Sequence, residues 1–185
     1  MDTYKVKWTQ LKREIFKLLC IKAGQELNIR EISRQIKISP TAVSKSIKEL
    51  EKYQLLTIKR SKTINLLLIS INRNNQRAIE EKRIENLRLI YESGFSEYLH
   101  YEFPGTTIIL FGSYSLGMDT QNENHKSDID IAIIGAKDKE INLSKFEKIF
   151  EREIRINFYD SWSAIHKHLK DNIINGIILN GSIEL

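Results

Sequence analysis

Two groups of residues that could do chemistry lie close together in the second half of the chain. Gly112 and Ser113 follow an apolar run, and a Gly-Ser turn that opens a helix offers backbone N–H groups to a phosphate. Asp128 follows Ser113 by 15 positions, and Asp130 comes two residues later, in a run of isoleucines. Side chains alternate along a strand, so both carboxylates lie on one face and repel each other unless a cation lies between them. The pattern predicts a phosphate cradle beside a Mg²⁺ site.

The segments around these residues predict the elements that hold them in place. The runs TTIILF, IDIAII and IRINFY are short, apolar and bounded by turn residues, as buried strands are. Helical patterns lie before and after the third run. The expected order is strand 106–111, short helix 114–117, strand 129–134, helix 143–150, strand 154–159, helix 162–176 and strand 177–181.

This order of elements and motifs resembles the minimal nucleotidyltransferases of the DNA polymerase β superfamily. The resemblance is carried by Phe111-Gly112-Ser113, Gly117 and Ser127-Asp128-Ile129-Asp130-Ile131, and residues 173–180 are similar to the closing helix and strand. It implies that Asp128 and Asp130 are catalytic residues that bind Mg²⁺. It implies that Gly112, Ser113 and Ser127 bind ATP or another nucleoside triphosphate. The implied reaction moves a nucleoside monophosphate from the triphosphate to a hydroxyl acceptor.

Two departures separate this chain from that family. The family supplies a third carboxylate on the next strand, whereas Asn157 stands there as a degenerate third catalytic position. An amide can offer an oxygen to a metal but cannot act as a base. The segment between Ser113 and Asp128 is also longer than in many members, and its polar run MDTQNENHK is expected to be a flexible loop at the rim of the site. The sequence therefore leaves transfer activity open.

The first part of the chain is strongly basic. Residues 1–72 contain 15 Lys/Arg and 6 Asp/Glu, although the formal charge of the whole chain is only +5. Helical patterns cover 9–22, 29–36 and 40–54, with Asn28 and Ser39 as expected N-caps and Pro40 as a first helical residue. Two β-rich runs, 55–60 and 63–71, then predict a hairpin. A basic region of this kind favours a polyanionic partner.

These elements resemble a winged helix-turn-helix domain of the archaeal and bacterial regulator type. Small polar and cationic residues on the outer face of the third helix fit a major groove, and a cationic hairpin would meet phosphates. A helical adaptor that binds protein is the alternative. The predicted contacts to double-stranded DNA are Ser39, Thr41, Ser44, Lys45, Lys48, Lys59, Arg60 and Lys62.

The expected fold class is α+β, in three parts. Residues 1–72 form the winged helix-turn-helix domain, 73–102 a helical connector, and 103–185 the nucleotidyltransferase-like domain with a mixed sheet and flanking helices. In the connector, an apolar stripe of Ile79, Ile84, Leu87 and Ile90 would either pack on the second domain or pair two subunits in a homodimer.

Composition excludes several classes of protein. The chain is 41% hydrophobic and 29% charged, which is typical of a folded globular protein. No apolar run approaches the roughly 20 residues that span a bilayer, and the N-terminus lacks the apolar core of a signal peptide, so no membrane partner is expected. The single Cys20 forms no intrachain disulfide, which is consistent with the cytoplasm.

Two functions from different classes follow. The first is a DNA-binding transcriptional regulator or antitoxin-type nucleotidyltransferase, whose acceptor could be a protein such as a partner toxin, because minimal nucleotidyltransferases often act as antitoxins. The second is a catalytically degenerate regulator, in which the second domain senses a nucleotide or forms a dimer. Asn157 favours the second function, and the Gly-Ser turn with its two acids favours nucleotide binding in either case.

Overall fold

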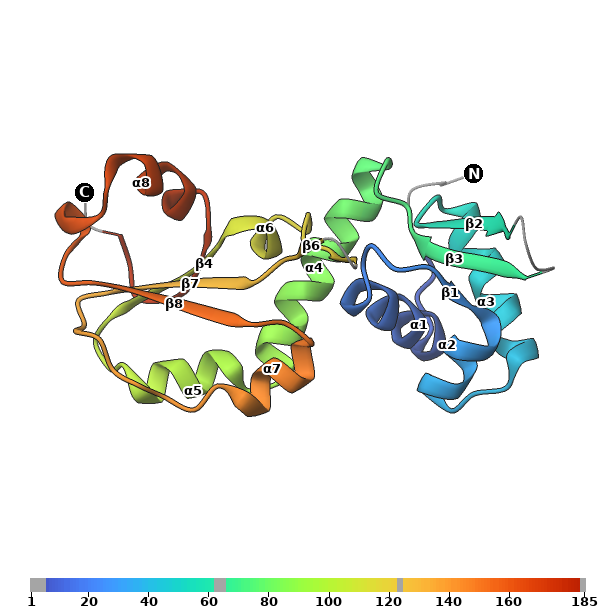
Figure 1. Cartoon of the computed structure of the whole chain (residues 1–185), viewed down its shortest axis with the longest axis horizontal. Coiled ribbons are helices and arrows are strands. Elements are labelled where there is room, and N and C mark those ends of the chain that lie inside the picture. The colour runs from blue at the N-terminus through green and yellow to red at the C-terminus, as the bar shows by residue number, and fades with distance from the viewer. Residues whose placement is uncertain (1–5, 62–65, 123–124, 184–185) are drawn as a thin grey trace. The chain divides into compact units, whose positions relative to one another are not determined.

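The computed structural model describes residues 6–61, 66–122 and 125–183 (Figure 1). The chain divides into two compact units, one within residues 1–82 and 120–125 and the other within 83–119 and 126–185. The boundary near residue 82 falls inside helix α4 (Gln76–Glu92). The predicted α+β class is confirmed, with a helical first region that carries a small sheet and a mixed sheet in the second.

The first unit is built from helices packed on a small antiparallel sheet. Within the described residues the sheet has the order β1-β3-β2, and β1 is a strand that the sequence did not predict. The elements are α1 (Gln10–Ile21), β1 (Leu27–Asn28), α2 (Ile29–Ile36), α3 (Pro40–Lys52), β2 (Leu56–Arg60) and β3 (Leu67–Ile71).

Local chemistry sets the helix starts where the sequence predicts them. The Asn28 side chain accepts from the backbone N–H of Glu31 at 3.0 Å, and the Glu31 carboxylate accepts from the backbone N–H of Asn28 at 2.8 Å. This capping box satisfies two N–H groups that the helix itself leaves unpaired. Ser39 caps α3 through the backbone N–H of Ala42, and Pro40 occupies the first turn.

One hydrophobic core holds the first unit together. Apolar side chains from all its helices and from the sheet are removed from water there, which is the main stabilising contribution to such a unit. The most deeply buried members are Ile15, Phe16, Leu19, Ile32, Val43, Ile47, Leu50, Leu55 and Ile69. Cys20 lies in the same core.

The polar segment after the Gly-Ser turn was expected to be a flexible loop at the rim of the site, but part of it is built into the first unit; residues 123–124 lie outside the described residues. It contains β5 (Gln121–Asn122) and β6 (His125–Lys126), which pair with each other, and residues 120–125 belong to the first unit. Thr120 and Gln121 are buried. The backbone N–H of Gln121 donates to the carbonyl of Ala23 at 2.5 Å, and the Gln25 amide donates to the carbonyl of Gln121 at 2.8 Å.

Gly24 allows this close approach. Its φ is +90°, and a Cβ at this position would collide with the hydroxyl of Thr120. A larger residue would therefore be strained twice, by its backbone conformation and by the clash.

Helix α4 buries the predicted apolar stripe only in part. Ile90 is buried, but Ile84 is 52% exposed. The buried positions instead include the polar residues Lys82, Glu85 and Asn86. The apolar stripe was wrong at Ile84 because polar groups on this helix find partners inside the protein, which hydrophobic periodicity does not reveal.

The second unit is a mixed sheet with helices on both faces. The order of its strands is β8-β7-β4-β9, in which β7 is antiparallel to β4 and parallel to β8. Figure 1 shows α5 and α7 on one side of the sheet and α8 on the other. The elements are α5 (Phe95–Glu102), β4 (Thr107–Phe111), α6 (Gly112–Ser115), β7 (Ile129–Ile134), α7 (Ser144–Phe150), β8 (Ile154–Tyr159), the 3-10 helix η1 (Trp162–Ala164), α8 (Lys167–Ile174) and β9 (Ile177–Asn180).

A buried ion pair fixes the base of the second unit. Arg152 Nη2 and Asp119 Oδ2 are 2.5 Å apart, and neither side chain is more than 1% exposed. The other carboxylate oxygen of Asp119 accepts from the amide of Asn86 at 2.7 Å, and that amide also donates to the carbonyl of Tyr114 at 2.9 Å. The pair thus joins the segment after α6 to the turn that leads into β8.

In the part of the chain that the structure describes, no helix is both long enough and apolar enough to cross a membrane.

An ion pair in the first unit predicts a pH dependence of stability. Lys12 Nζ lies 2.6 Å from Glu49 Oε2, and hydrogen bonding to Lys12 lowers the pKa of Glu49 below its usual 4.5. A carboxyl whose pKa is lower in the folded state stabilises the fold at pH values above its unfolded-state pKa. This stabilisation is lost as the pH falls through the folded-state pKa. Glu49→Gln should therefore lower Tm at pH 7 but change it little at pH 3, as measured by circular dichroism.

Glu51→Gln is the matched control for that variant. Glu51 is an exposed residue of the same helix, for which the described residues show no ion pair. An equal loss of Tm in both variants at pH 7 would contradict a specific role for the Lys12–Glu49 pair.

The buried pair in the second unit predicts a larger effect. Arg152→Met leaves the Asp119 carboxylate buried without its cation, which costs about 3–5 kcal/mol of unfolding free energy. Replacing both partners, as Asp119→Leu with Arg152→Met, removes both charges and should recover much of that loss. Urea unfolding of both variants measures the difference. Arg155→Met is the control, since its ion pair is solvent-exposed and should contribute at most about 1 kcal/mol.

Candidate nucleotide site and nucleic-acid interface

The antiparallel register of β4 and β7 brings the Gly-Ser turn to the two acids. Phe111, the last residue of β4, pairs with Asp130 on β7, so Gly112 begins α6 beside that carboxylate. Gly112 has a φ of +74°, and a Cβ there would collide with the Asp130 carboxylate. The positive φ favours glycine, and a Cβ at this position would displace the end of the Asp130 side chain. The predicted juxtaposition of turn and acid is a feature of the backbone itself.

The two aspartates differ in their surroundings. Asp128 Oδ2 lies 3.0 Å from Arg155 Nη1, whose side chain is 58% exposed. Burial raises the pKa of Asp130, the negative charge of Asp128 raises it further, and Arg155 opposes both effects. The Arg155 cation thus compensates only part of the negative charge, and Asp130 keeps an unfavourable environment for its ionised form.

Asn157 lies on the same face of the sheet, one step further along β8. Asp130 pairs with Arg155 and Ala132 pairs with Asn157 in the parallel register, and paired side chains share a face. The Asn157 amide donates to the backbone carbonyl of Ile131 at 3.4 Å. This hydrogen bond holds the amide against the neighbouring strand β7. A carboxylate at this position could not donate it.

The donor set fits one hard cation. Two neighbouring carboxylates, Asp128 directly before β7 and Asp130 within it, are ligands that a hard divalent cation takes together with phosphate oxygens. Among the described residues, no group of three or more His, Cys, Asp or Glu side chains could hold a metal by itself. Arg155 supplies a fixed positive charge near Asp128. The chemistry of these groups thus suits a divalent cation whose remaining ligands come from a bound nucleoside triphosphate.

The remaining predicted nucleotide-binding residues lie near this turn in the sequence and the fold. Ser113 is partly exposed in α6, and its carbonyl accepts from the backbone N–H of Met118 at 2.9 Å. Ser127 is buried directly before Asp128. The sequence did not predict that Asp119, Arg152 and Asn86 support this end of the unit. The only indication in the sequence was that these charged or polar residues stand next to apolar ones.

The predicted DNA contacts lie in two places: a groove beside α3, and the hairpin of β2 and β3, which we call the wing. Thr41, Ser44, Lys45 and Lys48 on α3 line a groove of about 560 Å³ together with Ile29 and Pro40. Both lysines are exposed there, which leaves their charges available to phosphates. The hydroxyl of Ser39 is used as the cap of α3.

The wing carries the other predicted cations. Lys59 and Arg60 are exposed at the end of β2, and Lys59 Nζ lies 3.4 Å from Glu26 Oε1. Glu26 therefore competes with phosphate for that lysine. Lys62 lies outside the described residues.

Family models match both units. Residues 12–57 match a model described as winged helix-turn-helix DNA-binding, and residues 92–180 match the nucleotidyltransferase domain. The first match supports binding of double-stranded DNA, and the second implies use of a divalent metal and a nucleoside triphosphate in general. No curated protein matches the chain.

Solved structures similar to this chain are bacterial regulators. A variant of ZitR from Lactococcus lactis is 24% identical, with 55% of this chain and 66% of that chain covered and a TM-score of 0.42. The wild-type ZitR in complex with DNA is 26% identical over 52% and 62% of the two chains, with a TM-score of 0.40. The adhesin competence repressor AdcR from Streptococcus pyogenes is 21% identical over 54% and 69%, with a TM-score of 0.43.

The match to the first ZitR structure thus spans slightly less than two thirds of that protein. The two family models account for different parts of the chain and agree with the order of elements described above. The chain therefore joins an N-terminal winged helix-turn-helix domain to a C-terminal nucleotidyltransferase domain.

Proposed function

We propose that this protein is a DNA-binding transcriptional regulator whose second unit binds a Mg-nucleotide, and whose affinity for DNA depends on that binding. The observation that carries the proposal is the contact between Gly112 and Asp130. The Gly112 backbone lies so close to the Asp130 carboxylate that a Cβ would collide with it. One bound nucleotide could therefore reach both the phosphate-binding turn and the carboxylate that binds the metal.

In this proposal each residue of the site has a separate task. Backbone N–H groups of α6 and the Ser113 hydroxyl bind the terminal phosphates of the nucleotide. Asp128 and Asp130 hold Mg²⁺, which when bound neutralises phosphate charge and polarises the phosphoryl oxygens. Arg155 keeps Asp128 in place and limits the repulsion between the two acids. ATP is the first candidate among nucleoside triphosphates.

The path of the chain supports coupling between nucleotide and DNA. The segment that joins Ser113 to Asp128 contributes residues 120–125 to the unit that carries the winged helix. There it is bonded to Ala23 and Gln25, in the turn that follows α1. A nucleotide that shifts the two ends of this segment changes its fit in the first unit. The shift in DNA affinity is limited by the difference in nucleotide affinity between the two states.

Nucleotidyl transfer to a hydroxyl acceptor is the second candidate function. The Gly-Ser turn and both aspartates favour it, and a protein such as a partner toxin would be an acceptor of suitable chemistry. Asn157 disfavours it, because an amide cannot take a proton from the attacking hydroxyl.

A homodimer of this cytoplasmic protein would suit a two-fold symmetric operator.

Gly112→Ala should weaken Mg-ATP binding by more than tenfold, since the new methyl group displaces the Asp130 carboxylate. Isothermal titration calorimetry measures the affinity. Gly135→Ala is the matched control, because Gly135 also has a positive φ, +93°, but a Cβ there meets nothing within 4 Å. Both variants should lose about 1 kcal/mol of stability through strain, and only the first should lose affinity. If both variants bind Mg-ATP with equal affinity, the phosphates do not bind at the turn that begins at Gly112.

Lys45→Ala and Lys48→Ala should each reduce the slope of log K against log[salt] for DNA binding by about one. Lys52→Ala, an exposed lysine of the same helix outside the groove, should leave the slope unchanged. Fluorescence anisotropy with labelled upstream DNA of the host operon measures both quantities. A slope unchanged in all three variants would contradict the groove as the DNA interface.

Mg-ATP should change the DNA affinity of the wild type in the same assay. Asp128→Ala with Asp130→Ala should remove the effect and keep DNA binding. Gln25→Ala should weaken the effect while Mg-ATP still binds, because one bond of the joining segment is lost. A nucleotide effect that survives in the double aspartate variant would overturn the proposed regulation.

Asn157→Asp separates the two candidate functions. Label transfer from α-phosphate-labelled triphosphate to components of host lysate should be absent in wild type and should appear in Asn157→Asp if only the third carboxylate is missing. Transfer by wild type that is lost in the double aspartate variant would instead establish the enzyme, and the labelled band would identify its acceptor.

A further inference from the structure

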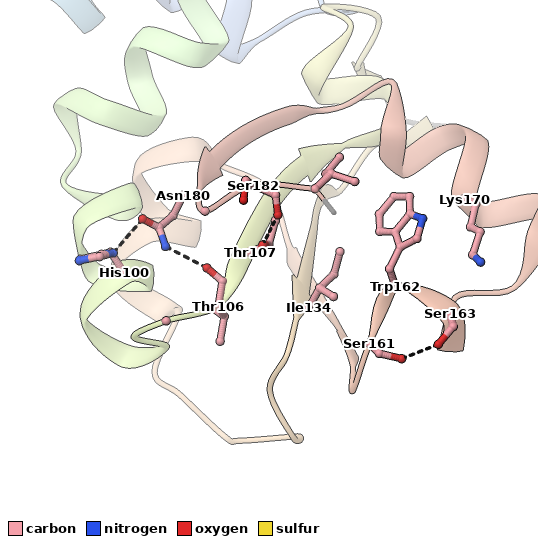
Figure 2. A pocket seen from close by; sticks show the side chains of 13 residues that line it. His100, Thr106, Thr107, Ile134, Ser161, Trp162, Ser163, Lys170, Asn180 and Ser182 are labelled. Atoms are coloured by element: carbon pink, nitrogen blue, oxygen red, sulfur yellow. Dashed lines mark hydrogen bonds between the residues drawn. The ribbon is translucent and has the colours of Figure 1, made fainter. Parts of the chain in front are cut away.

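The second unit contains another hollow, far from the two aspartates. It has a volume of about 760 Å³ and lies at the opposite end of β4 and β7, beside Thr107 and Ile134 (Figure 2). Asp130 pairs with Phe111 at one end of the strands and Ile134 pairs with Thr107 at the other. Four residues along a strand separate the two places by about 13 Å. We name this hollow the Trp162 pocket; its volume is in the range of small-molecule sites.

The walls of the Trp162 pocket differ in character from one side to the other. Figure 2 shows Trp162 and Lys170, from η1 and α8, on one side and the linked pair His100 and Asn180 on the other. Ile134 adds an apolar surface next to the indole side. Thr107 and Ser182 lie between the two walls, and the linked hydroxyls of Ser161 and Ser163 lie on the side of Trp162 and Lys170 (Figure 2). One ligand could therefore meet an aromatic face, hydroxyls and a cation.

Most polar groups around the Trp162 pocket already have partners. The His100 ring bonds to the Asn180 side chain at 3.0 Å, and the Asn180 amide donates to the carbonyl of Thr106 at 2.9 Å. Thr107 donates to the carbonyl of Ser182 at 2.7 Å. These bonds hold the wall at the ends of β4 and β9 in one arrangement, so the pocket is shaped before a ligand arrives.

Two donors on the Trp162 side of the pocket have no such partner. Within the described residues, neither Lys170 Nζ nor Trp162 Nε1 has a hydrogen-bond partner, although both side chains are partly buried. Among the described residues, the lining includes Lys170 and His100 but no Asp or Glu side chain. A ligand with acceptor oxygens and negative charge would satisfy these donors. A planar ring would use the indole face, since aromatic stacking accepts any flat π-system.

We propose that the Trp162 pocket binds a nucleoside monophosphate without a metal. The base would lie on the indole of Trp162, the ribose would meet the hydroxyls, and the phosphate would pair with Lys170. This site is separate in place and chemistry from the Mg-nucleotide site, because it lies at the opposite end of β4 and β7 and its lining within residues 6–61, 66–122 and 125–183 includes no acidic side chain. It does not depend on the function proposed for Asp128 and Asp130.

The experiment uses Trp162 as its own reporter. The chain has two tryptophans, so Trp8→Phe leaves Trp162 as the single source of tryptophan fluorescence. The full-length Trp8→Phe protein is titrated in EDTA with each of the four nucleoside monophosphates, with adenosine, and with inorganic phosphate. At least one monophosphate should change the emission with saturation, and adenosine and phosphate should each bind at least about tenfold more weakly.

Variants decide whether the signal comes from this pocket. Lys170→Met should weaken binding about tenfold, whereas Lys167→Met, an exposed lysine of the same helix outside the pocket, should not. Asp128→Ala with Asp130→Ala should leave binding unchanged. Loss of binding in that double variant would assign the nucleotide to the other site and overturn the proposal. Equal affinity in Lys170→Met and wild type would overturn it too.

Equilibrium dialysis with labelled monophosphate covers the case of a binding event that leaves the emission unchanged. Wild type should retain label in EDTA, and Trp162→Ala should retain much less. Near-ultraviolet circular dichroism confirms that the variants are folded. No retention by wild type of any of the four monophosphates at millimolar concentration would overturn the proposal.

Discussion

The second unit depends on one buried contact, the ion pair between Asp119 and Arg152. Two charges taken out of water are tolerated only when they satisfy each other and their remaining hydrogen-bonding groups. Here Asn86 takes up the second carboxylate oxygen, and the carbonyl of Phe150 takes up another guanidinium N–H at 2.8 Å. The pair ties the end of the Gly-Ser segment to the start of β8, and so it sets where the two halves of the candidate site stand relative to each other.

The site itself is balanced by charge rather than by packing. Two carboxylates lie on one strand, and one arginine on the next strand offsets part of their repulsion. That arginine belongs to the protein, so the acids can stay together before any metal binds. The same arrangement reduces the demand for a second cation, which is consistent with Asn157 in place of an acid.

Much of the fold followed from local pattern. The caps at Asn28 and Ser39, the strands of both sheets apart from β1, and the two matched families are as the sequence predicts, because caps, apolar alternation and turns are local properties. The exposed Ile84 and the ion pair of Asp119 were not predictable, since both depend on partners distant in sequence. The functional roles of Asp128, Asp130 and Asn157 stay predictions, although the register places them on one face.

The short stretch at 120–125 gives the first unit a discontinuous sequence. Its hydrogen bonds to the Ala23–Gln25 turn join residues 96 to 98 positions apart. Closing so long a loop carries an entropic cost and raises the contact order of a unit that otherwise has short connections. On the ribosome, the winged helix can therefore collapse early but cannot finish its packing until residue 125 has left the exit tunnel. The DNA-binding half of this chain matures only after much of its partner domain has been synthesised.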